Sequence, residues 1–278
     1  MRALHLIILD IRNGIAAKWY RGALAAVLFL FIDAVVLAFP PAARGEQMVA
    51  PSLGDYYVNL FAGMSWSAFD PEMPVVLPIA WLSVTFFILY ITLDYPYEEL
   101  HGIGKHLAVL SGDRVSWWAA KCLWVLLVVL LYFLTWLVVT VLWVIATKGN
   151  LDFATSSNTA MILGYETDML LQSSWALSGF VIVTLFTVCA LCLFQMFFSL
   201  CLKPIFAFMI SVILLFISNY IASPFLIGNY LMATRSQTFI SSGLDWVMGT
   251  FISAWIILAA VVFGGWYFSR MDVLAREG

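Results

Sequence analysis

The chain has 278 residues, of which 64% are hydrophobic and only 10% are charged, and its formal net charge at pH 7 is -3. A soluble domain carries about 25% charged residues, so this composition excludes a soluble globular protein and predicts that a lipid bilayer covers most of the surface. The few charges give no indication of a nucleic-acid partner. We therefore expect an all-α, polytopic membrane protein that forms a single transmembrane domain over residues 1–278.

Residues 1–20 are apolar but interrupted by charged and histidine side chains. Their large apolar side chains recur at three- and four-residue spacing and share one helix face: Leu4, Ile7, Ile8, Ile11, Ile15 and Trp19. This pattern predicts an amphipathic helix that lies in the inner membrane interface instead of spanning the bilayer. The alternative is a simple extension of the first span.

Six apolar segments follow that are long enough to cross a bilayer: residues 21–39, 75–93, 122–146, 175–201, 205–221 and 247–268. Residues 40–74 and 147–174 are expected to be outer loops, the first with a short surface helix near residues 53–62. Residues 222–246 are irregular and half apolar, which predicts a re-entrant or interfacial element on the outer side. Irregular backbone at membrane depth requires that other parts of the protein cover it.

The Lys and Arg residues are unequally divided between the two sides of this arrangement. Three of the 13 lie on one side, namely Arg44, Lys148 and Arg235, and ten lie on the other. Because positively charged residues stay in the cytoplasm, both termini and residues 94–121 are predicted to be cytoplasmic.

Residues 94–121, between the second and third spans, hold the densest run of charged and histidine side chains. Pro96 followed by Glu98 and Glu99 predicts the start of a short helix, because proline suits the first turn and acids stabilise the positive end of the helix dipole. A second helix is expected to begin at residues 111–113 and to run directly into the third span. Trp117 and Trp118 would then lie at the lipid headgroups, with Lys121 extending toward water.

This loop is a candidate coupling helix that docks on a soluble partner and passes its motion to the second and third spans. The candidate coupling residues are Glu98, Glu99, His101, Lys105 and Arg114. The alternative is an ordinary charged loop that only establishes the topology.

The chain contains no GxxxxGK motif followed by Ser or Thr, no HExxH and no GxSxG. It is therefore not expected to hydrolyse ATP through a phosphate-binding loop, to act as an enzyme or to bind a metal. Cys189 and Cys192 form a CxxC within an apolar segment and are interpreted as small buried side chains.

Asp33 is the only acidic residue within the six predicted spans. It is a candidate for the translocation path together with Asn219. The alternative for Asp33 is a hydrogen bond to neighbouring helices near the outer interface. Single amides such as Gln195 and Asn219 more often form helix–helix hydrogen bonds than bind ligands.

Over nearly its full length the chain resembles the membrane subunit of a type-2 ABC transporter. The matching parts are the leader at residues 1–20, the six spans, and residues 102–105, 111–121 and 228–232. The resemblance implies that the chain is a permease that pairs with a second permease subunit, identical or homologous, in a bacterial cytoplasmic membrane. It also implies that each permease receives a cytosolic ATPase subunit, which binds ATP and Mg, while this chain binds no cofactor.

In that family the leader helix and the loop between the second and third spans contact the ATPase. An amphipathic substrate such as a peptide, an antibiotic or a lipid-linked molecule would be exported between the two permeases, in contact with membrane lipids. The outer loop at residues 40–74 is long for a compact member. An ion-coupled secondary carrier and a membrane-embedded lipid-modifying enzyme are the alternatives. The first would need several carboxylates within the spans and inverted repeats, and the second would need acids or histidines clustered across several spans.

Overall fold

The computed structural model describes residues 2–38, 51–64, 77–101, 114–156, 159 and 176–270. Within these ranges the regular structure is helical, and extended pairing is confined to two isolated bridges, Ser52 with Asn150 and Ser236 with Leu244. The expected all-α fold class is confirmed. In chain order the elements are α1 (Arg2–Asp10), the π-helix η1 (Ile11–Ala16), α2 (Tyr20–Ala38), α3 (Leu53–Leu60), α4 (Ile79–Leu93), α5 (Tyr95–His101), α7 (Arg114–Ala146), α10 (Ala176–Cys201), α11 (Pro204–Tyr220), the 3-10 turns η3 (Ile227–Leu231) and η4 (Ala233–Arg235), and α12 (Trp246–Arg270).

Five helices in the described part of the chain are long and apolar enough to cross a membrane: α2, α4 with its continuation α5, α7, α10 and α12. The remaining predicted span, residues 205–221, corresponds to α11, which is apolar but has 17 residues. At 1.5 Å per residue it is about 26 Å long, slightly less than a hydrocarbon core of about 30 Å. The helices indicate a multi-pass membrane protein.

Local sequence signals explain where several helices begin. Span 75–93 was predicted to start earlier than α4 does: Pro78 is its N-cap and Ile79 its first residue. Proline lacks an N–H and disfavours a helical residue before it, so the helix cannot extend backward through Pro78. At α11, Pro204 occupies the first turn, where a missing N–H costs nothing.

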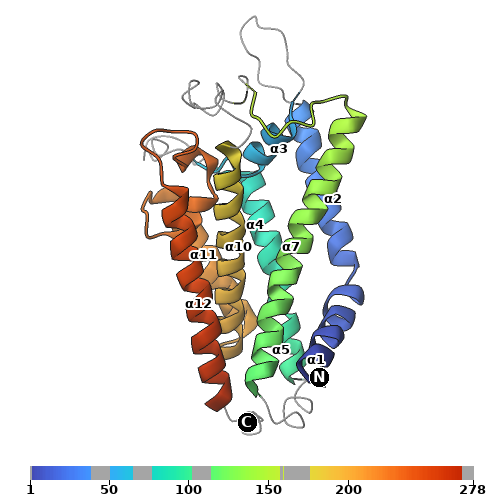
Figure 1. Ribbon diagram of the computed structural model, residues 1–278, viewed down its shortest axis with the longest axis vertical. Helices are drawn as coiled ribbons and strands as arrows, with labels where there is room; N and C mark the ends of the chain where they lie inside the picture. The colour runs from blue at the N-terminus through green and yellow to red at the C-terminus, as the bar shows by residue number, and fades with distance from the viewer. Residues whose placement is uncertain are drawn as a thin grey trace, which may run out of the picture.

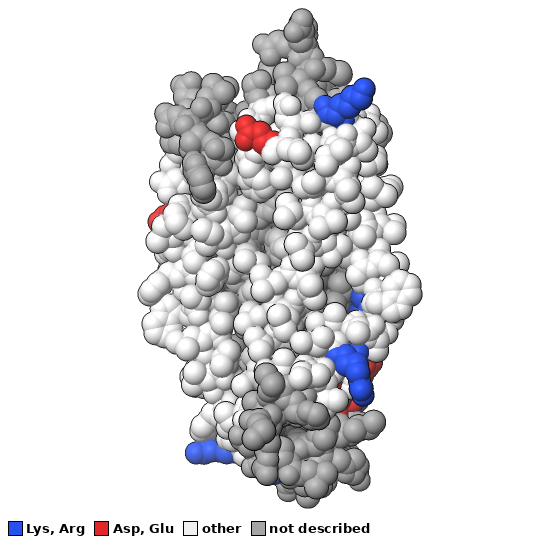
Figure 2. Space-filling view, turned by 45° about the vertical axis from the view of Figure 1, so that its right-hand side comes forward, with Lys and Arg blue, Asp and Glu red and all other residues white. Residues whose placement is uncertain are grey.

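The long helices run side by side along the longest axis of the molecule (Figure 1). We call the end that contains α1, η1, α5 and the first turns of α7 the charged end. The opposite end, formed by α3, residues 149–156, η3 and η4, is the loop end. On the face shown in Figure 2, Lys, Arg, Asp and Glu gather toward these two ends, with a broad and almost entirely uncharged belt between them. This distribution is typical of a bundle surrounded by lipid.

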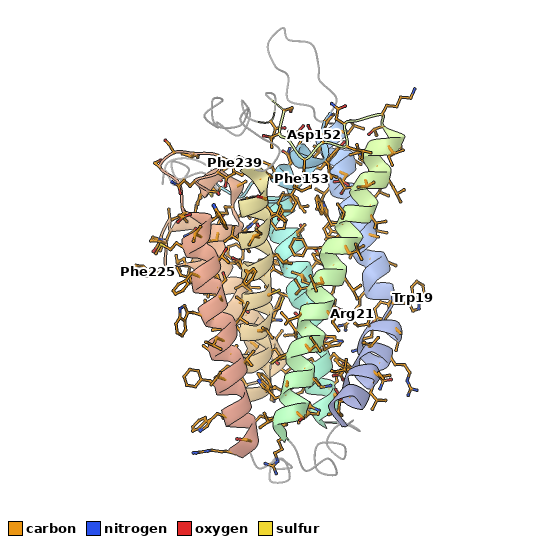
Figure 3. All side chains as sticks on the ribbon, viewed as in Figure 1. Trp19, Arg21, Asp152, Phe153, Phe225 and Phe239 are labelled. Carbon is orange, nitrogen blue, oxygen red and sulfur yellow. The ribbon has the colours of Figure 1, made fainter. Side chains whose placement is uncertain are left out.

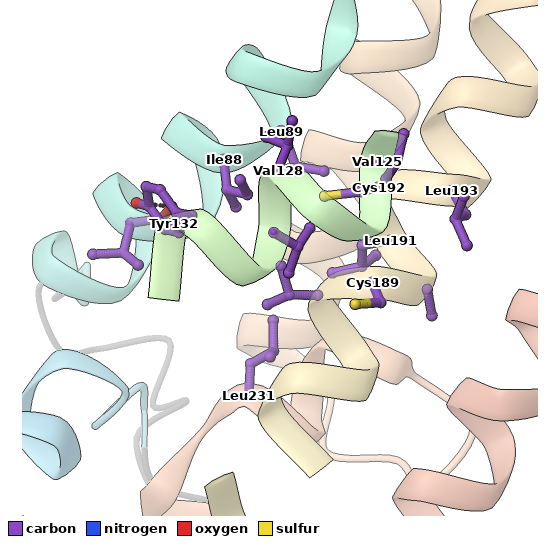
Figure 4. Packing of buried hydrophobic residues seen from close by; sticks show 14 of the residues in the cluster. Ile88, Leu89, Val125, Val128, Tyr132, Cys189, Leu191, Cys192, Leu193 and Leu231 are labelled. Atoms are coloured by element: carbon purple, nitrogen blue, oxygen red, sulfur yellow. Dashed lines mark hydrogen bonds between the residues drawn. The ribbon is translucent and has the colours of Figure 1, made fainter. Parts of the chain in front are cut away.

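The core is built around α10, which packs against α12, α11, α4 and α7. Figure 4 shows how this helix places the buried thiols of Cys189 and Cys192 among apolar side chains of its neighbours: Ile88 and Leu89 from α4, Val125, Val128 and Tyr132 from α7, and Leu231 from η3. The amide Nε2 of Gln195 donates a 2.7 Å hydrogen bond to the Leu89 carbonyl. The predicted use of Gln195 as a helix–helix hydrogen bond is therefore confirmed.

The first turns of α7 carry two tryptophans that are buried inside the protein. The helix has 33 residues, about 50 Å, and it runs from Arg114 into the predicted third span without a break, as expected. The Trp117 ring stacks on Phe268 at a centroid distance of 4.5 Å, and Trp118 Nε1 donates a 2.9 Å hydrogen bond to the Val261 carbonyl. Both side chains are therefore buried against α12, and their depth relative to the lipid headgroups stays a prediction.

The short helix expected near residues 53–62 is present as α3, but it is buried and not superficial. Ser52 and Asp55 form a capping box, in which Asp55 N donates to Ser52 Oγ at 3.1 Å and Ser52 N donates to Asp55 Oδ2 at 2.8 Å. The remaining oxygen of Asp55 accepts a 2.7 Å hydrogen bond from Ser156 N. This carboxylate therefore fastens the segment after α7 over α3, which covers the helix.

Candidate functional site

The N-terminal helices pack on the charged end through one narrow face. Leu6, Asp10 and Gly14, spaced four residues apart, are buried, and α1 packs along α7. Ile8, Ile11 and Trp19 from the predicted apolar face are exposed. The helix therefore has an apolar side that faces away from the protein and a second side that docks on it. The predicted amphipathic helix is present, and its position in the membrane interface stays a prediction.

Gly14 allows the π-helix η1 to approach α5 and α7 closely. A Cβ atom at this residue would lie 2.4 Å from Trp124 Nε1 and 2.8 Å from Tyr95 Cε1, far inside van der Waals contact. At Gly22, in the first turn of α2, a Cβ atom would meet nothing within 4 Å. The two glycines therefore form a matched pair.

We expect Gly14→Ala to lower the free energy of unfolding by about 1–3 kcal/mol, because the added methyl group overpacks a buried contact. Gly22→Ala should leave stability unchanged or raise it by up to about 1 kcal/mol, since alanine favours the helix. Unfolding of the purified protein in detergent, followed by tryptophan fluorescence, measures both. Equal effects of the two substitutions would contradict the close approach at Gly14.

A buried ionic cluster joins α1, α5 and α7 at the charged end. Lys121 Nζ contacts both Asp10 Oδ1 and Glu99 Oε2, and Tyr95 donates a 2.9 Å hydrogen bond to the same oxygen of Asp10. The side chains of Lys121, Asp10 and Glu99 are only 1%, 2% and 15% exposed. Ions removed from water to this degree persist only when they are paired and hydrogen-bonded.

The aromatic rings beside Lys121 add to its stabilisation. Its ammonium lies 5.0 Å from the centroid of the Tyr95 ring and 5.2 Å from that of Trp117, within cation–π range. The expectation that Lys121 extends toward water is wrong, because carboxylates from two other helices and two rings surround it inside the protein.

Two further ion pairs connect the turn between η1 and α2 to the junction of α4 and α5. Lys18 Nζ lies 2.6 Å from Glu98 Oε2. Arg21 donates a 2.7 Å hydrogen bond to the Ile91 carbonyl and lies 3.4 Å from Asp94 Oδ2. Together with the Lys121 cluster, these contacts fix the N-terminal helices to the segments on both sides of residues 102–113.

The predicted coupling residues are therefore placed differently from one another. Glu98 lies on α5 with its side chain 59% exposed, whereas Glu99 turns inward to Lys121. Arg114 begins α7 and is half-buried. His101 ends α5, but its side chain, like the whole of Lys105, lies outside the described residues.

The sequence interpretation did not include Asp10 and Tyr95 in this site. The signal available for Asp10 was a single carboxylate within a strongly apolar leader, which requires a cation once it is buried.

Asp33 and Asn219, the two candidates for the translocation path, contact different partners. Asp33 is buried in α2, where its Oδ2 accepts a 2.8 Å hydrogen bond from Thr140 Oγ1 of α7. Asn219, at the end of α11, directs its Nδ2 to the sulfur of Met64 at 3.3 Å. The contact of Asp33 is a bond to a neighbouring helix, which is the alternative considered for it, and a role of either residue in a path stays a prediction.

The loop end contains a buried cation that sequence analysis counted only as an outer charge. Arg235 donates from Nε to the Met64 carbonyl at 2.7 Å, from Nη1 to the Ser218 carbonyl at 2.6 Å and to the Asn229 side chain, and from Nη2 to the Asn219 carbonyl at 2.6 Å. Two of these carbonyls belong to the last turn of α11, where the helix dipole favours a cation. Burial lowers the pKa of Arg235 to about 10, so it is still protonated at neutral pH.

Residues 222–246 are irregular, as predicted, with η3 and η4 buried and tied by Arg235 to the end of α11 and to residue 64. The placement of this element at the outer side of a membrane stays a prediction.

Among the described residues, no group of three or more His, Cys, Asp or Glu side chains is arranged to hold a metal ion. Comparison with known proteins finds no matching family model, no matching characterised protein and no matching solved structure. The function has to be inferred from the residues and contacts of the chain itself.

Proposed function

We propose that this chain is the permease subunit of an ATP-driven ABC exporter, working as a pair with a second identical or homologous subunit. The proposed topology has six spans, α2, α4–α5, α7, α10, α11 and α12, with both termini on the cytoplasmic side of a bacterial membrane. The substrate would be amphipathic. ATP and Mg would be bound by a separate cytosolic ATPase, because the chain has no phosphate-binding loop.

The observation that carries this proposal is the ionic connection at the charged end. An ATPase that pushes on residues 94–121 needs a stiff connection to the spans. Four ion pairs join the segments on both sides of residues 102–113 to each other and to the N-terminal helices: Lys121 with Asp10 and with Glu99, Lys18 with Glu98, and Arg21 with Asp94.

Long helices lead from these ion pairs into the bundle. α5 is separated from α4 by Asp94 alone, and α7 continues from the charged end for 33 residues. A displacement of the loop would therefore move α1, α4 and α7 together, which is what coupling of ATP hydrolysis to a transport path requires.

The test is to search the neighbouring genes for one that encodes a P-loop ATPase, co-express its product with the chain, purify the complex and measure ATP hydrolysis. We expect Glu98→Ala and Arg114→Ala to weaken complex formation and ATPase stimulation, whereas Asp152→Ala, which removes an exposed acid at the loop end, should change neither. Lys18→Ala is the matched control for Glu98, because it breaks the same ion pair and leaves the carboxylate in place.

Two results would overturn the proposal. The first is a complex and an ATPase activity that are indifferent to substitutions throughout residues 94–121. The second is labelling of a cysteine introduced at residue 111, in a chain without its native cysteines, by an impermeant maleimide added to the outer face of the membrane.

A further inference from the structure

The bend between η1 and α2 contains a groove that opens on the side of the bundle. Its volume is about 270 Å³. One wall is formed by Ile15 and Ala25 of the N-terminal helices and the other by Val128 and Leu131 of α7, while Lys18 and Arg21 contribute the cations. Figure 3 shows Arg21 between α7 and α2, with Trp19 projecting outward beside it. The groove is therefore apolar along its length and basic where η1 turns into α2.

Arg21 has fewer acceptors than its degree of burial demands. A guanidinium offers five N–H donors. Arg21 gives one short bond to the Ile91 carbonyl, while Asp94 lies at 3.4 Å, the long limit of a hydrogen bond. Its Nε is buried and finds no partner among the described residues, although the side chain is only 8% exposed.

Arg235 provides the comparison within the same molecule. It is similarly buried, yet each of its three nitrogens donates, to four acceptors in total. Every nitrogen of this buried guanidinium thus has an acceptor that the protein supplies. The deficit at Arg21 indicates that an acceptor from outside the chain completes it.

We infer that this groove binds a membrane phospholipid, with its phosphate on Arg21 and Lys18 and the first part of an acyl chain along Ala25, Val128 and Leu131. Guanidinium groups bind phosphate oxygens with two parallel hydrogen bonds. Arg21 uses one N–H of Nη1 on Ile91 and one of Nη2 on Asp94, so each of these nitrogens has a second N–H to offer a phosphate. Lys18 uses one of its three donors on Glu98 and has others to offer.

The surroundings of the groove select a lipid over a soluble anion. Trp19 is 72% exposed beside the opening, and Leu131 is also exposed to the bilayer side. Tryptophan is enriched at the boundary between hydrocarbon and headgroups, so the opening lies where a phosphate passes into an acyl chain. The volume is below the roughly 300–1,000 Å³ of cavities that enclose whole drug-sized ligands, so the groove holds part of a lipid.

This inference requires only that the bundle lies in a bilayer, and it does not depend on the proposed transport function. The test is a titration of the purified full chain in detergent with phosphatidylglycerol, followed by native mass spectrometry. Parallel titrations use diacylglycerol with the same acyl chains and inorganic phosphate. We expect phosphatidylglycerol to bind, diacylglycerol to bind much more weakly, and inorganic phosphate not to compete at millimolar concentration.

Two substitutions in the groove provide independent readouts. Arg21→Gln should weaken the tightest phosphatidylglycerol site by about tenfold to a hundredfold, because a hydrogen bond to a charged group is lost. Gly22→Leu should block the site while preserving the fold, since Gly22 lines the groove and its Cβ position is open. The controls are Arg270→Gln, at the exposed end of α12, and Ala23→Leu, an exposed neighbour of Gly22.

If Arg21→Gln does not fold, Gly22→Leu decides the question. Unchanged affinity in Gly22→Leu overturns the site. Binding of diacylglycerol as tight as that of phosphatidylglycerol would show an apolar groove without phosphate recognition. Competition by inorganic phosphate that depends on Arg21 would show a soluble-anion site, and either result rejects the phospholipid.

Discussion

Replacing Arg235 with leucine is expected to lower the free energy of unfolding by about 3–5 kcal/mol, the largest single effect at the loop end. The substitution leaves four buried oxygens without a donor, from Met64, Ser218, Asn219 and Asn229. Each buried acceptor that loses its partner costs about 1–3 kcal/mol, reduced where the structure relaxes or water enters. Unfolding in detergent, monitored by tryptophan fluorescence, measures the loss.

Two control substitutions distinguish this network from a general effect of positive charge. Arg270→Leu removes a guanidinium that lies on the exposed Trp266 ring at 4.6 Å, and it should cost less than about 1 kcal/mol. Arg235→Lys should recover only part of the loss, because an ammonium is a compact charge that cannot reach all four acceptors. A chain with Arg235→Leu as stable as the parent would refute the role given to this side chain.

Substitution of Lys121 by methionine is expected to release the N-terminal helix from the bundle. Asp10 and Glu99 would then face each other inside the protein without a cation, and breaking a buried ion pair from one side costs about 3–5 kcal/mol. The loss should be accompanied by faster hydrogen exchange in α1 and η1, with α10 and α12 little changed. Hydrogen exchange with mass spectrometry resolves these segments.

The combined variant Asp10→Asn, Glu99→Gln and Lys121→Met tests whether charge is the cause. With every charge of the cluster removed, most of the stability should return, because no ion is left unpaired. Lys203→Met, at an exposed lysine before α11, should have no measurable effect. If the triple variant is as unstable as Lys121→Met, packing around the lysine stem is responsible instead of the ion pairs.

Both expected results concern side chains whose environment was not predictable from their neighbours in the sequence. Lys121 was placed toward water, because a lysine at the start of a span usually extends that way. Its carboxylate partners lie 22 and 111 residues away. The same holds for the partners of Trp117 and Trp118, which pack on α12, more than a hundred residues later in the chain.

The sequence by itself determined the class of protein and the positions of the long helices. Residues 21–39, 205–221 and 247–268 were predicted, and the helices are Tyr20–Ala38, Pro204–Tyr220 and Trp246–Arg270. This agreement has a local cause, because the length of an apolar run and the prolines that begin or end it act within a few residues. The short helices expected near residues 53–62 and from Pro96 are present as α3 and α5.

Only the tertiary structure decided which polar groups are buried and what they bind. α3 is covered because Asp55 holds Ser156, and Arg235 is a structural cation because the ends of α11 and η3 converge on it. A charge stays buried only where folding brings its partners from distant segments. Without those partners, moving the ion out of water is strongly unfavourable. A pattern of neighbouring residues carries no information about those partners, which is why the helices were predictable and their polar contacts were not.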